Sequence, residues 1–374
     1  MRRAAACAVL AAAALAGCSS APTGPQPAPL PEIGEAKPVR VLWRAQVGDA
    51  GAFFFAPAVV GDAVYAAARD GTVVRLDASS GKQRWSVDAE LQLSAGVGAS
   101  RSSVAVANEE GVVTVLEAET GKLRWRARVS SEVLAPPVVA AGLVLVRSID
   151  NRLFAFEEAD GKRRWVYQRA PQSLILRTPA GAVVDADSAY AGFRGGKLAA
   201  ISLSNGGLRW ETTVALPRGA TELERVTDVV GDPVLQEREV CAAAYQGRVA
   251  CYEKASGRPV WGRELSSITG VSVDARYAYA ADERGAIHAL DRSTGRSLWK
   301  QERLAHRRLT LPVPAGNAIA AGDFEGYVHF LARDSGDFVA RHKSEGGAVR
   351  AAPVLLPQGL LIQTSEGALH ALAP

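Results

Sequence analysis

The sequence predicts an all-β fold, an eight-bladed β-propeller made of four-stranded antiparallel blades. One observation is a unit of about 40 residues that repeats eight times, the period of a propeller blade. A second is that turn residues divide each unit into four short apolar runs. A third is that the first tryptophan of the series has no repeat before it, while the last repeat ends before its tryptophan. The two chain ends are therefore expected to complete one blade together.

The chain begins with features of an export signal. Arg2 and Arg3 precede an uncharged run over residues 4–16, which is too short to cross a hydrocarbon core of about 30 Å. The run ends in Leu15-Ala16-Gly17-Cys18, which resembles the bacterial lipobox. This resemblance implies removal of residues 1–17 and lipidation of Cys18; an ordinary signal peptide with an incidental cysteine is the alternative.

The lipobox resemblance also implies a location. Ser19, rather than an aspartate, follows the cysteine, and in Gram-negative lipoprotein sorting this implies the outer membrane, with the body of the protein in the periplasm. Six prolines lie within residues 19–39, so residues 18–39 are expected to be the lipidated cysteine and an extended, mobile tether. Residues 40–374 are left for the propeller.

The repeat itself is defined by glycine and tryptophan. Taking Gly71 as an origin, Trp85 follows fourteen residues later, and the same step recurs along the chain. A glycine lies ten residues after the origin in seven units: Gly81, Gly121, Gly161, Gly206, Gly257, Gly295 and Gly336. Each unit reads as two hairpins whose turns need the positive φ that glycine or asparagine supplies. The tryptophans are therefore predicted to pack between blades.

The two ends of the series indicate how the ring closes. Gly367 begins the last unit but leaves no room for a tryptophan before Pro374. The strand around Trp43 supplies the missing one, so residues 41–47 are expected to pair with residues 369–373. Such pairing removes exposed sheet edges. Ala340 stands in the tryptophan position of the seventh unit.

Two units are longer than the others. The extra residues fall within 166–195 and 211–246, in connections that run from the outer strand of one blade to the inner strand of the next. These connections share one face of a propeller. Loops lengthened on one face of a rigid ring are typical binding sites.

Composition narrows the function. The 374 residues are 48% hydrophobic and 22% charged, with a formal net charge of +4 and no long run of one sign. This indicates a globular chain and disfavours nucleic-acid binding. The sequence contains no nucleophile-elbow, zinc-protease or P-loop motif. We therefore expect a protein that is not an enzyme and has no cofactor.

Several longer sequence segments resemble a known family. Residues 70–85 resemble the PQQ-like repeat, which occurs in quinoprotein dehydrogenases and in non-enzymatic scaffolds. The segments 173–184, 221–234, 306–313 and 322–330 are similar to the BamB family, the propeller lipoproteins of the outer-membrane β-barrel assembly machinery. The resemblance implies a non-catalytic scaffold that docks on the periplasmic POTRA domains of the insertase BamA, alongside other subunits. The resemblance also implies unfolded outer-membrane proteins as further partners.

The same resemblance implies particular contact residues. A Leu-x-Leu-Arg motif matches Leu174, Leu176 and Arg177, and an acidic motif matches Asp228. Val230 stands where the family has a second acid. One polar contact that the resemblance implies is therefore not expected from this residue. The alternative for Leu174 and Leu176 is a buried strand.

Two other functions remain as alternatives. One is a dehydrogenase dependent on pyrroloquinoline quinone, against which the lack of a Cys-Cys pair and the short chain both count. The other is a general periplasmic chaperone that binds unfolded chains by strand addition.

Cysteine and histidine residues were weighed as sites. Cys241 and Cys251 flank a turn and can form a disulfide in an oxidising compartment, or remain small core residues. His288, His329 and His370 occupy one repeat position on three successive blades. Equivalent atoms on adjacent blades are expected to lie about 10 Å apart, too far for one zinc ion. No metal site is therefore predicted.

Overall fold

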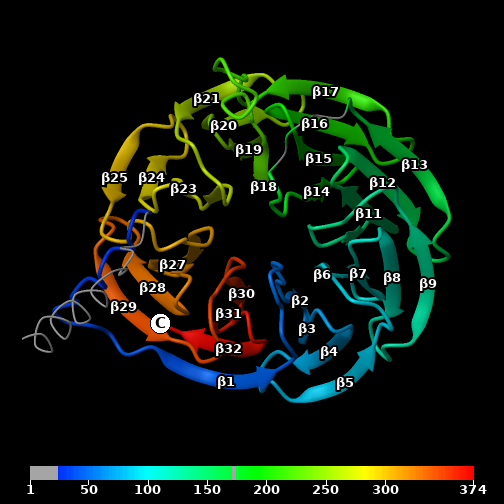
Figure 1. Cartoon of the computed structure of the whole chain (residues 1–374), viewed down its shortest axis with the longest axis horizontal. Helices are drawn as coiled ribbons and strands as arrows, with labels where there is room; N and C mark the ends of the chain where they lie inside the picture. Colours follow the sequence, from blue (N-terminus) through cyan, green and yellow to red (C-terminus); the bar gives the residue numbers. More distant parts are fainter. Residues whose placement is uncertain (1–23, 171–173, 175) are drawn as a thin grey trace, which may run out of the picture.

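The chain forms a ring of eight blades (Figure 1). The computed structural model describes residues 24–170, 174 and 176–374, and in this part of the chain 32 strands form eight four-stranded antiparallel sheets. No helix occurs among these residues. The predicted all-β, eight-bladed propeller is confirmed.

Each blade has its first strand nearest the centre of the ring and its last strand on the outside (Figure 1). Blade 1 consists of β2 (Ala58–Val60), β3 (Ala63–Ala67), β4 (Thr72–Asp77) and β5 (Gln83–Asp88), and blade 2 of β6 (Ala95–Ala99), β7 (Ser103–Ala107), β8 (Val112–Glu117) and β9 (Leu123–Arg128). Blade 3 consists of β10 (Val138–Ala140), β11 (Leu143–Ser148), β12 (Arg152–Glu157) and β13 (Arg163–Gln168), and blade 4 of β14 (Ala182–Asp185), β15 (Ser188–Phe193), β16 (Lys197–Ser202) and β17 (Leu208–Thr213). Blade 5 consists of β18 (Val229–Leu235), β19 (Glu239–Ala244), β20 (Arg248–Glu253) and β21 (Pro259–Glu264), and blade 6 of β22 (Ser272–Val273), β23 (Tyr277–Ala281), β24 (Ile287–Asp291) and β25 (Ser297–Gln301). Blade 7 consists of β26 (Val313–Ala315), β27 (Ala318–Gly322), β28 (Tyr327–Ala332) and β29 (Phe338–Lys343).

Blade 8 joins the two ends of the chain. It contains β30 (Val354–Leu356), β31 (Gly359–Gln363), β32 (Ala368–Ala373) and, outermost, β1 (Arg40–Gln46). β1 lies antiparallel to β32, with Arg40 opposite Ala373 and Gln46 opposite Ala368. The predicted closure of the ring by its own ends is confirmed.

Burial explains the apolar pattern of the strands. The second strand of a blade is covered on both faces by neighbouring blades, so every residue of β3 and of β15 is buried. The fourth strand faces solvent on one side, and β13 accordingly alternates around the buried Trp165. Continuous apolar runs therefore mark the middle of a blade, and alternating runs mark its outer edge.

The tryptophans join each blade to the next. Each of the seven indole Nε1–H groups donates a hydrogen bond of 2.5–3.1 Å to a main-chain carbonyl of the following blade. The glycine ten residues after the origin of that blade lies against the indole ring; a Cβ on Gly161, for example, would stand 2.6 Å from Cδ2 of Trp125. The two repeated residues are thus partners across the interface between blades, as the predicted packing role requires.

The exception at Ala340 has a structural reason. In other blades the indole lies under the turn between the third and fourth strands of the next blade. Blade 8 has no such turn, because β32 ends at Ala373 and the chain restarts in β1 at Arg40. Ala340 is instead buried in a cluster that Val39 and Val41 partly cover. A tryptophan at this position would lack both the main-chain carbonyl that accepts the indole N–H and the glycine that packs against the indole ring in the other blades.

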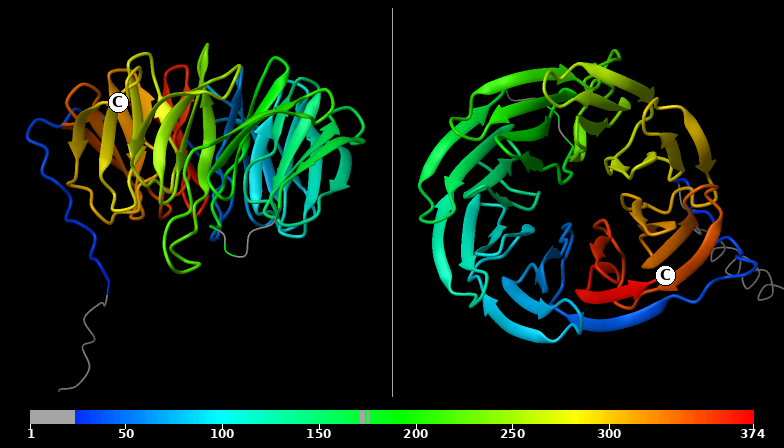
Figure 2. Two further views of the ribbon diagram at one scale, coloured as in Figure 1. Left: turned by 90° about the horizontal axis from the view of Figure 1, so that it is seen from above. Right: turned by 180° about the vertical axis from the view of Figure 1, so that it is seen from behind.

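All connections between blades lie on one side of the ring, together with the turns between the second and third strands. We call this side the connecting face. The two longest of these connections are β13–β14 (residues 169–181) and β17–β18 (residues 214–228). Both predicted insertions are therefore on the connecting face, where they protrude below the ring in the side view of Figure 2.

The segment before β1 is bound to the ring. Residues 24–39 contain no strand, yet the main-chain N–H groups of Ala28 and Lys37 donate to Ala305 and Val339, both at 2.8 Å. Pro31 is buried. The mobile tether expected over residues 18–39 stays a prediction, although residues 28–37 have hydrogen-bond partners at Ala305 and in blade 7.

Candidate functional site: the connecting face

The predicted contact residues come together on the connecting face. Leu174 has an exposed fraction of 45% and lies outside any strand, and Leu176 is partly buried. Ile175, between them, lies outside the described residues. The alternative of a buried strand does not hold for Leu174, so an exposed apolar side chain is available in the first insertion.

Asp228 has a different position from its predicted neighbours. Its side chain is buried, and its carboxylate accepts a hydrogen bond of 3.0 Å from the main-chain N–H of Leu176. The other carboxylate oxygen accepts one of 3.4 Å from Gly195. Asp228 therefore links the two insertions and fixes where Leu176 lies, rather than presenting its own charge to solvent.

Arg177 is held at the surface by neighbouring blades. Its guanidinium makes two hydrogen bonds to the Glu132 carboxylate, of 2.7 and 2.6 Å, and lies 3.7 Å from Glu109. The Arg177 side chain is still 57% exposed. A two-pronged arginine–carboxylate pair sets the direction of the guanidinium, so Arg177 is held in one orientation while part of its side chain stays exposed.

A partly buried arginine supports the base of the first insertion. Arg147 donates to the Ala180 carbonyl at 2.7 Å, and its guanidinium lies 5.1 Å from the centre of the Phe193 ring. Burial, followed by the neighbouring Arg194, lowers the pKa of Arg147 to about 10. Burial also lowers the pKa of Arg194.

The second insertion is ordered by a capping box. The Thr221 hydroxyl accepts from the Glu224 N–H at 3.2 Å, and the Glu224 carboxylate accepts from the Thr221 N–H at 3.0 Å. Hydrogen bonds from the main-chain N–H groups of Thr221 and Ala220 lower the pKa of Glu224. This reciprocal pair closes a compact turn, and Leu223 stands between its two members with 71% of its side chain exposed.

The sequence reasoning missed several exposed apolar residues of this face. Leu216 and Leu223 lie in the β17–β18 connection and Ile268 in the β21–β22 connection, with exposed fractions of 56%, 71% and 39%. No motif or repeat position marked these residues in the sequence. Together with Leu174 and Arg177 they make up what we call the loop patch, on three successive connections.

A hollow of about 440 Å³ extends from Arg177 towards blade 1. Phe53, Phe54 and Leu134 supply its apolar lining, and Arg69 and Glu109 its charged rim. Arg69 lies 4.3 Å from the centre of the Phe53 ring and 3.0 Å from Glu109. The hollow therefore combines an apolar floor with a charged rim.

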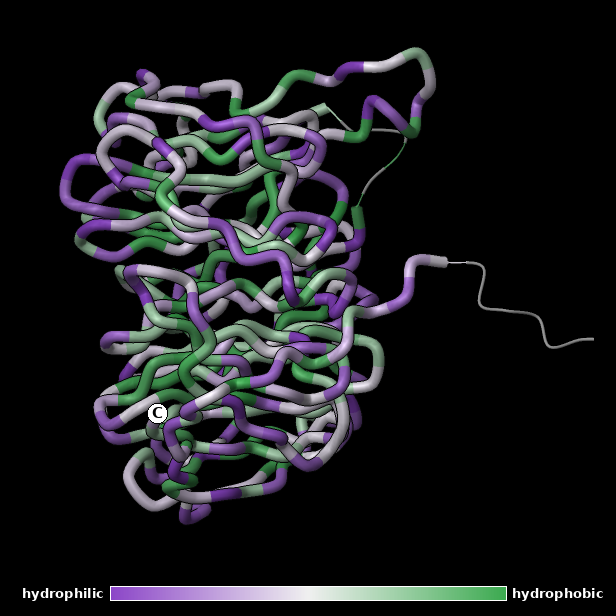
Figure 3. Tube along the Cα trace, turned by 90° about the vertical axis from the view of Figure 1, so that its left-hand side faces the viewer, coloured by the Kyte–Doolittle hydropathy of each residue, from purple (hydrophilic) through white to green (hydrophobic). Residues whose placement is uncertain are grey.

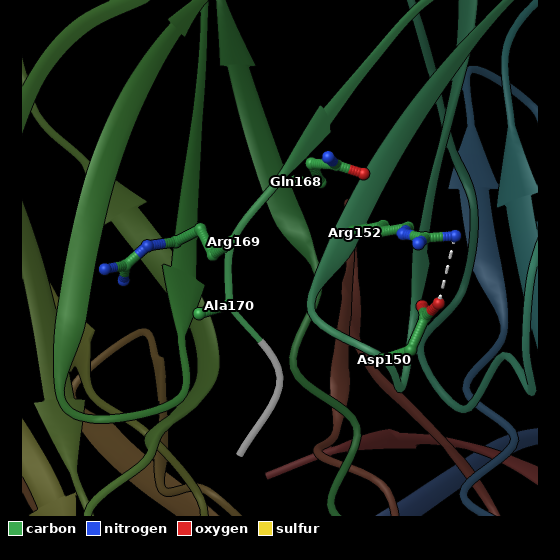
Figure 4. Close-up of a pocket in the computed structure, with 5 residues that line it drawn as sticks. All are labelled: Asp150, Arg152, Gln168, Arg169 and Ala170. Atoms are coloured by element: carbon green, nitrogen blue, oxygen red, sulfur yellow. Dashed lines mark ion pairs between the residues drawn. The ribbon is translucent and has the colours of Figure 1, made fainter.

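A second hollow, of about 320 Å³, lies where the first insertion leaves blade 3 (Figure 4). Arg152 and Asp150 form an ion pair of 3.5 Å on one side, while Arg169 turns away towards Glu211 at 3.1 Å. Polar groups dominate this hollow, so it adds hydrogen-bonding capacity beside the loop patch.

The valine in the acidic motif has a buried position. Val230 is 1% exposed in β18, which suits an apolar residue. Two residues further, the exposed Asp232 accepts a hydrogen bond of 2.8 Å from Gly181 at the end of the first insertion. The acid at this end of β18 thus stands at Asp232.

The remaining candidates are structural. Cys241 and Cys251 lie opposite each other on β19 and β20 and form a disulfide, with Cα atoms 4.0 Å apart. Together with Glu239 they are the one group spaced for a metal within the described residues, but bonded sulfurs offer no thiolate ligands. His288 and His329 each lie 2.9 Å from an aspartate of their own blade.

The fold defines a class: a PQQ-like repeat propeller whose two longest loops lie on one face. The family model described as "Outer membrane protein assembly factor BamB" matches residues 35–92 and 69–301. The proteins of that name from Bordetella pertussis and Burkholderia pseudomallei are 44% and 41% identical, covering 95% and 96% of this chain and 93% and 94% of their own. The chain belongs to the BamB family.

Solved structures agree with this assignment. The crystal structure of BamB from Moraxella catarrhalis has a TM-score of 0.83 at 26% identity and covers 90% of this chain and all of that one. A quinohemoprotein alcohol dehydrogenase from Pseudomonas putida has a TM-score of 0.69 at 13% identity, covering 88% of this chain and 72% of its own. The dehydrogenase likeness concerns the fold alone.

Among the described residues, no helix is long and apolar enough to span a membrane.

Proposed function

We propose that this protein is a non-catalytic scaffold of outer-membrane protein assembly, whose loop patch docks on the periplasmic POTRA domains of a BamA-like insertase. The observation that carries the proposal is the exposed Leu174 beside a guanidinium fixed by Glu132, on the one face where the ring extends its loops. The names of the curated relatives support the role in assembly.

The arrangement suits recognition of a folded partner. Leu174, Leu216 and Leu223 offer apolar area, and Arg177 offers a charged contact of the type enriched at interface hot spots. A rigid ring presents these loops with little entropy left to lose on binding. Asp228 contributes indirectly, by holding Leu176 through its main chain.

Anchoring completes the proposed role. The lipobox at Leu15–Cys18 supports lipidation of Cys18, which lies outside the described residues. Acyl chains in the outer membrane then hold the propeller on the periplasmic face of that membrane, where incoming outer-membrane proteins meet the machinery.

Co-purification tests the proposed docking. Leu174→Glu with Arg177→Glu removes the apolar contact and reverses the charge, and we expect the recovery of the insertase with the lipidated protein to fall by about tenfold or more. Both side chains are exposed, so the ring remains folded. Recovery equal to that of the wild type overturns the assignment.

The chain offers a matched control. Leu208→Glu with Arg163→Glu changes an exposed leucine and an exposed arginine on the outer strands of blades 4 and 3. This variant makes the same charge change away from the connecting face, and we expect it to co-purify like the wild type.

A further inference from the structure

The N-terminal segment before β1 carries an inference about how the ring is oriented. Residues 28–37 cross the outer strand of blade 7, from Ala305 in the β25–β26 connection to Val339 in β29. We call this segment the strap. Its two main-chain hydrogen bonds, at Ala28 and Lys37, fix both of its ends.

A buried charge network holds the strap. Arg307 is 2% exposed, and its guanidinium donates to the Asp323 carboxylate at 2.8 Å and to the Ala28 carbonyl at 2.9 Å. A third donor of Arg307 reaches Glu325. A buried guanidinium needs hydrogen-bond partners for its N–H groups. The Ala28 carbonyl is one of the three acceptors that satisfy Arg307.

A second arginine of the same network, Arg341, binds the strap at Pro31. Arg341 donates to the Pro31 carbonyl at 2.6 Å and lies 3.4 Å from Nδ1 of His329. The other nitrogen of His329 lies 2.9 Å from Asp323. One fully buried carboxylate therefore orients both cationic groups that bind the strap.

The strap also serves the ring. The outer edge of β29 is the place where the repeat lacks its tryptophan, and Val39 and Val41 pack against the cluster that contains Ala340. The strap and the residues that follow it thus cover an otherwise open strand edge, which is a common need of β-proteins.

The position of the strap determines the face from which the N-terminus leaves. Ala28 contacts the β25–β26 connection, so the chain departs from the connecting face, the face of the loop patch. Two views agree, since the N-terminal segment and the two insertions lie on the same side of the ring in Figure 2 and Figure 3.

We propose that the strap makes the connecting face the membrane-facing side of the ring, so that the loop patch and the lipid anchor point the same way. The inference rests on the proposed lipidation of Cys18 and partner surface. Ten residues separate Cys18 from Ala28 and can span at most about 35 Å. A tether free up to Arg40 would span about 75 Å and impose no orientation.

Main-chain exchange tests the strap itself. Hydrogen–deuterium exchange of the lipidated chain, read by mass spectrometry with fragmentation, measures the amides of residues 24–39. We expect those of Ala28 and Lys37 to exchange at least about tenfold more slowly than that of Gln26, whose main chain makes no such bond among the described residues. Equal rates overturn the strap.

Energy transfer to the bilayer tests the orientation. A donor dye is attached at Arg218→Cys, on the β17–β18 connection, or at Asn205→Cys, in the opposite turn of the same blade, and acceptors label the headgroups of phosphatidylethanolamine–phosphatidylglycerol vesicles. We expect at least twofold greater transfer from Arg218→Cys. Equal or reversed transfer overturns the proposal.

A pair of proline variants links the two measurements. Ala28→Pro and Lys37→Pro combined with Arg341→Ala removes both N–H donors of the strap and the side chain that donates to the Pro31 carbonyl, and should bring the transfer ratio towards one; Gln26→Pro is the control that should leave it unchanged. A ratio that persists in the triple variant shows that the strap is not the cause. The vesicles contain no insertase, so failure here is distinct from failure of the proposed docking.

Discussion

The contact between Gly161 and Trp125 allows the joints between blades to be tested. Gly161 has a φ of +72°, and a Cβ there would stand 2.6 Å from Cδ2 and 2.7 Å from Cε3 of the indole. Gly142, in the same blade, has a φ of +73° with nothing within 4 Å of its Cβ position. The two glycines therefore differ in the indole contact but share a positive φ.

The magnitudes follow from this comparison. Gly142→Ala places alanine in a left-handed conformation, which costs about 1–2 kcal/mol. Gly161→Ala carries the same cost plus the displacement of a packed ring, for which overpacking adds about 1–3 kcal/mol. We expect the free energy of unfolding to fall by about 2–5 kcal/mol for Gly161→Ala and by about 1–2 kcal/mol for Gly142→Ala.

Urea denaturation of the mature chain, followed by circular dichroism, measures both variants. Combining Gly161→Ala with Trp125→Ala should remove the clash, so the cost of the glycine change should fall to that of Gly142→Ala in the Trp125→Ala background. Equal destabilisation by the two single glycine variants would refute the pairing of glycine and tryptophan as the joint between blades.

Two further groups give measurable predictions. The imidazoles of His342 and His370 lie 5.7 Å apart between β29 and β32, and burial lowers the pKa of both. The folded chain therefore binds protons at these imidazoles less readily than the unfolded chain does, so stability is lost as the pH falls below about 6.5, the usual pKa of a histidine in an unfolded chain. His370→Gln should make the urea midpoint depend less on pH between about pH 7 and 5. The Cys241–Cys251 disulfide closes a sequence separation of 10 residues, so its reduction should lower the free energy of unfolding by about 2–3 kcal/mol. Unreduced protein that gains alkyl mass on both cysteines would contradict that bond.

The architecture was largely accessible from the sequence, because it rests on a repeat. Glycine and tryptophan recur where main-chain conformation and interblade packing allow little else, so the blade count, the closure by β1 and the face of the insertions could all be inferred. Ala340 was visible as an exception, but its reason was not. That reason depends on the break between β32 and β1, which becomes apparent only when the next blade is placed beside it.

The site could be predicted less well, because a sequence motif does not show whether its residues are buried or which groups they contact. The acidic motif located Asp228 but not its buried position under Leu176. Cys241 and Cys251 were compatible with either thiols or a disulfide until their strands were placed in register. Leu216 and Leu223 carry no repeat signal, and only the exposed turn that presents them identifies them as candidates.

The strap shows why a proline-rich segment is the hardest part to interpret. Its own residues have no apolar period, so composition alone predicts a mobile chain. The groups that bind it, Arg307 and Arg341, lie about 280 and 310 residues further along the chain, and neither would be recognised as a ligand for main-chain carbonyls before blade 7 is folded. Because these arginines already bond to Asp323 and His329, their direction is set by the blade. The strap therefore takes its order from a surface built elsewhere in the sequence, and its exit on the connecting face follows from the position of that surface.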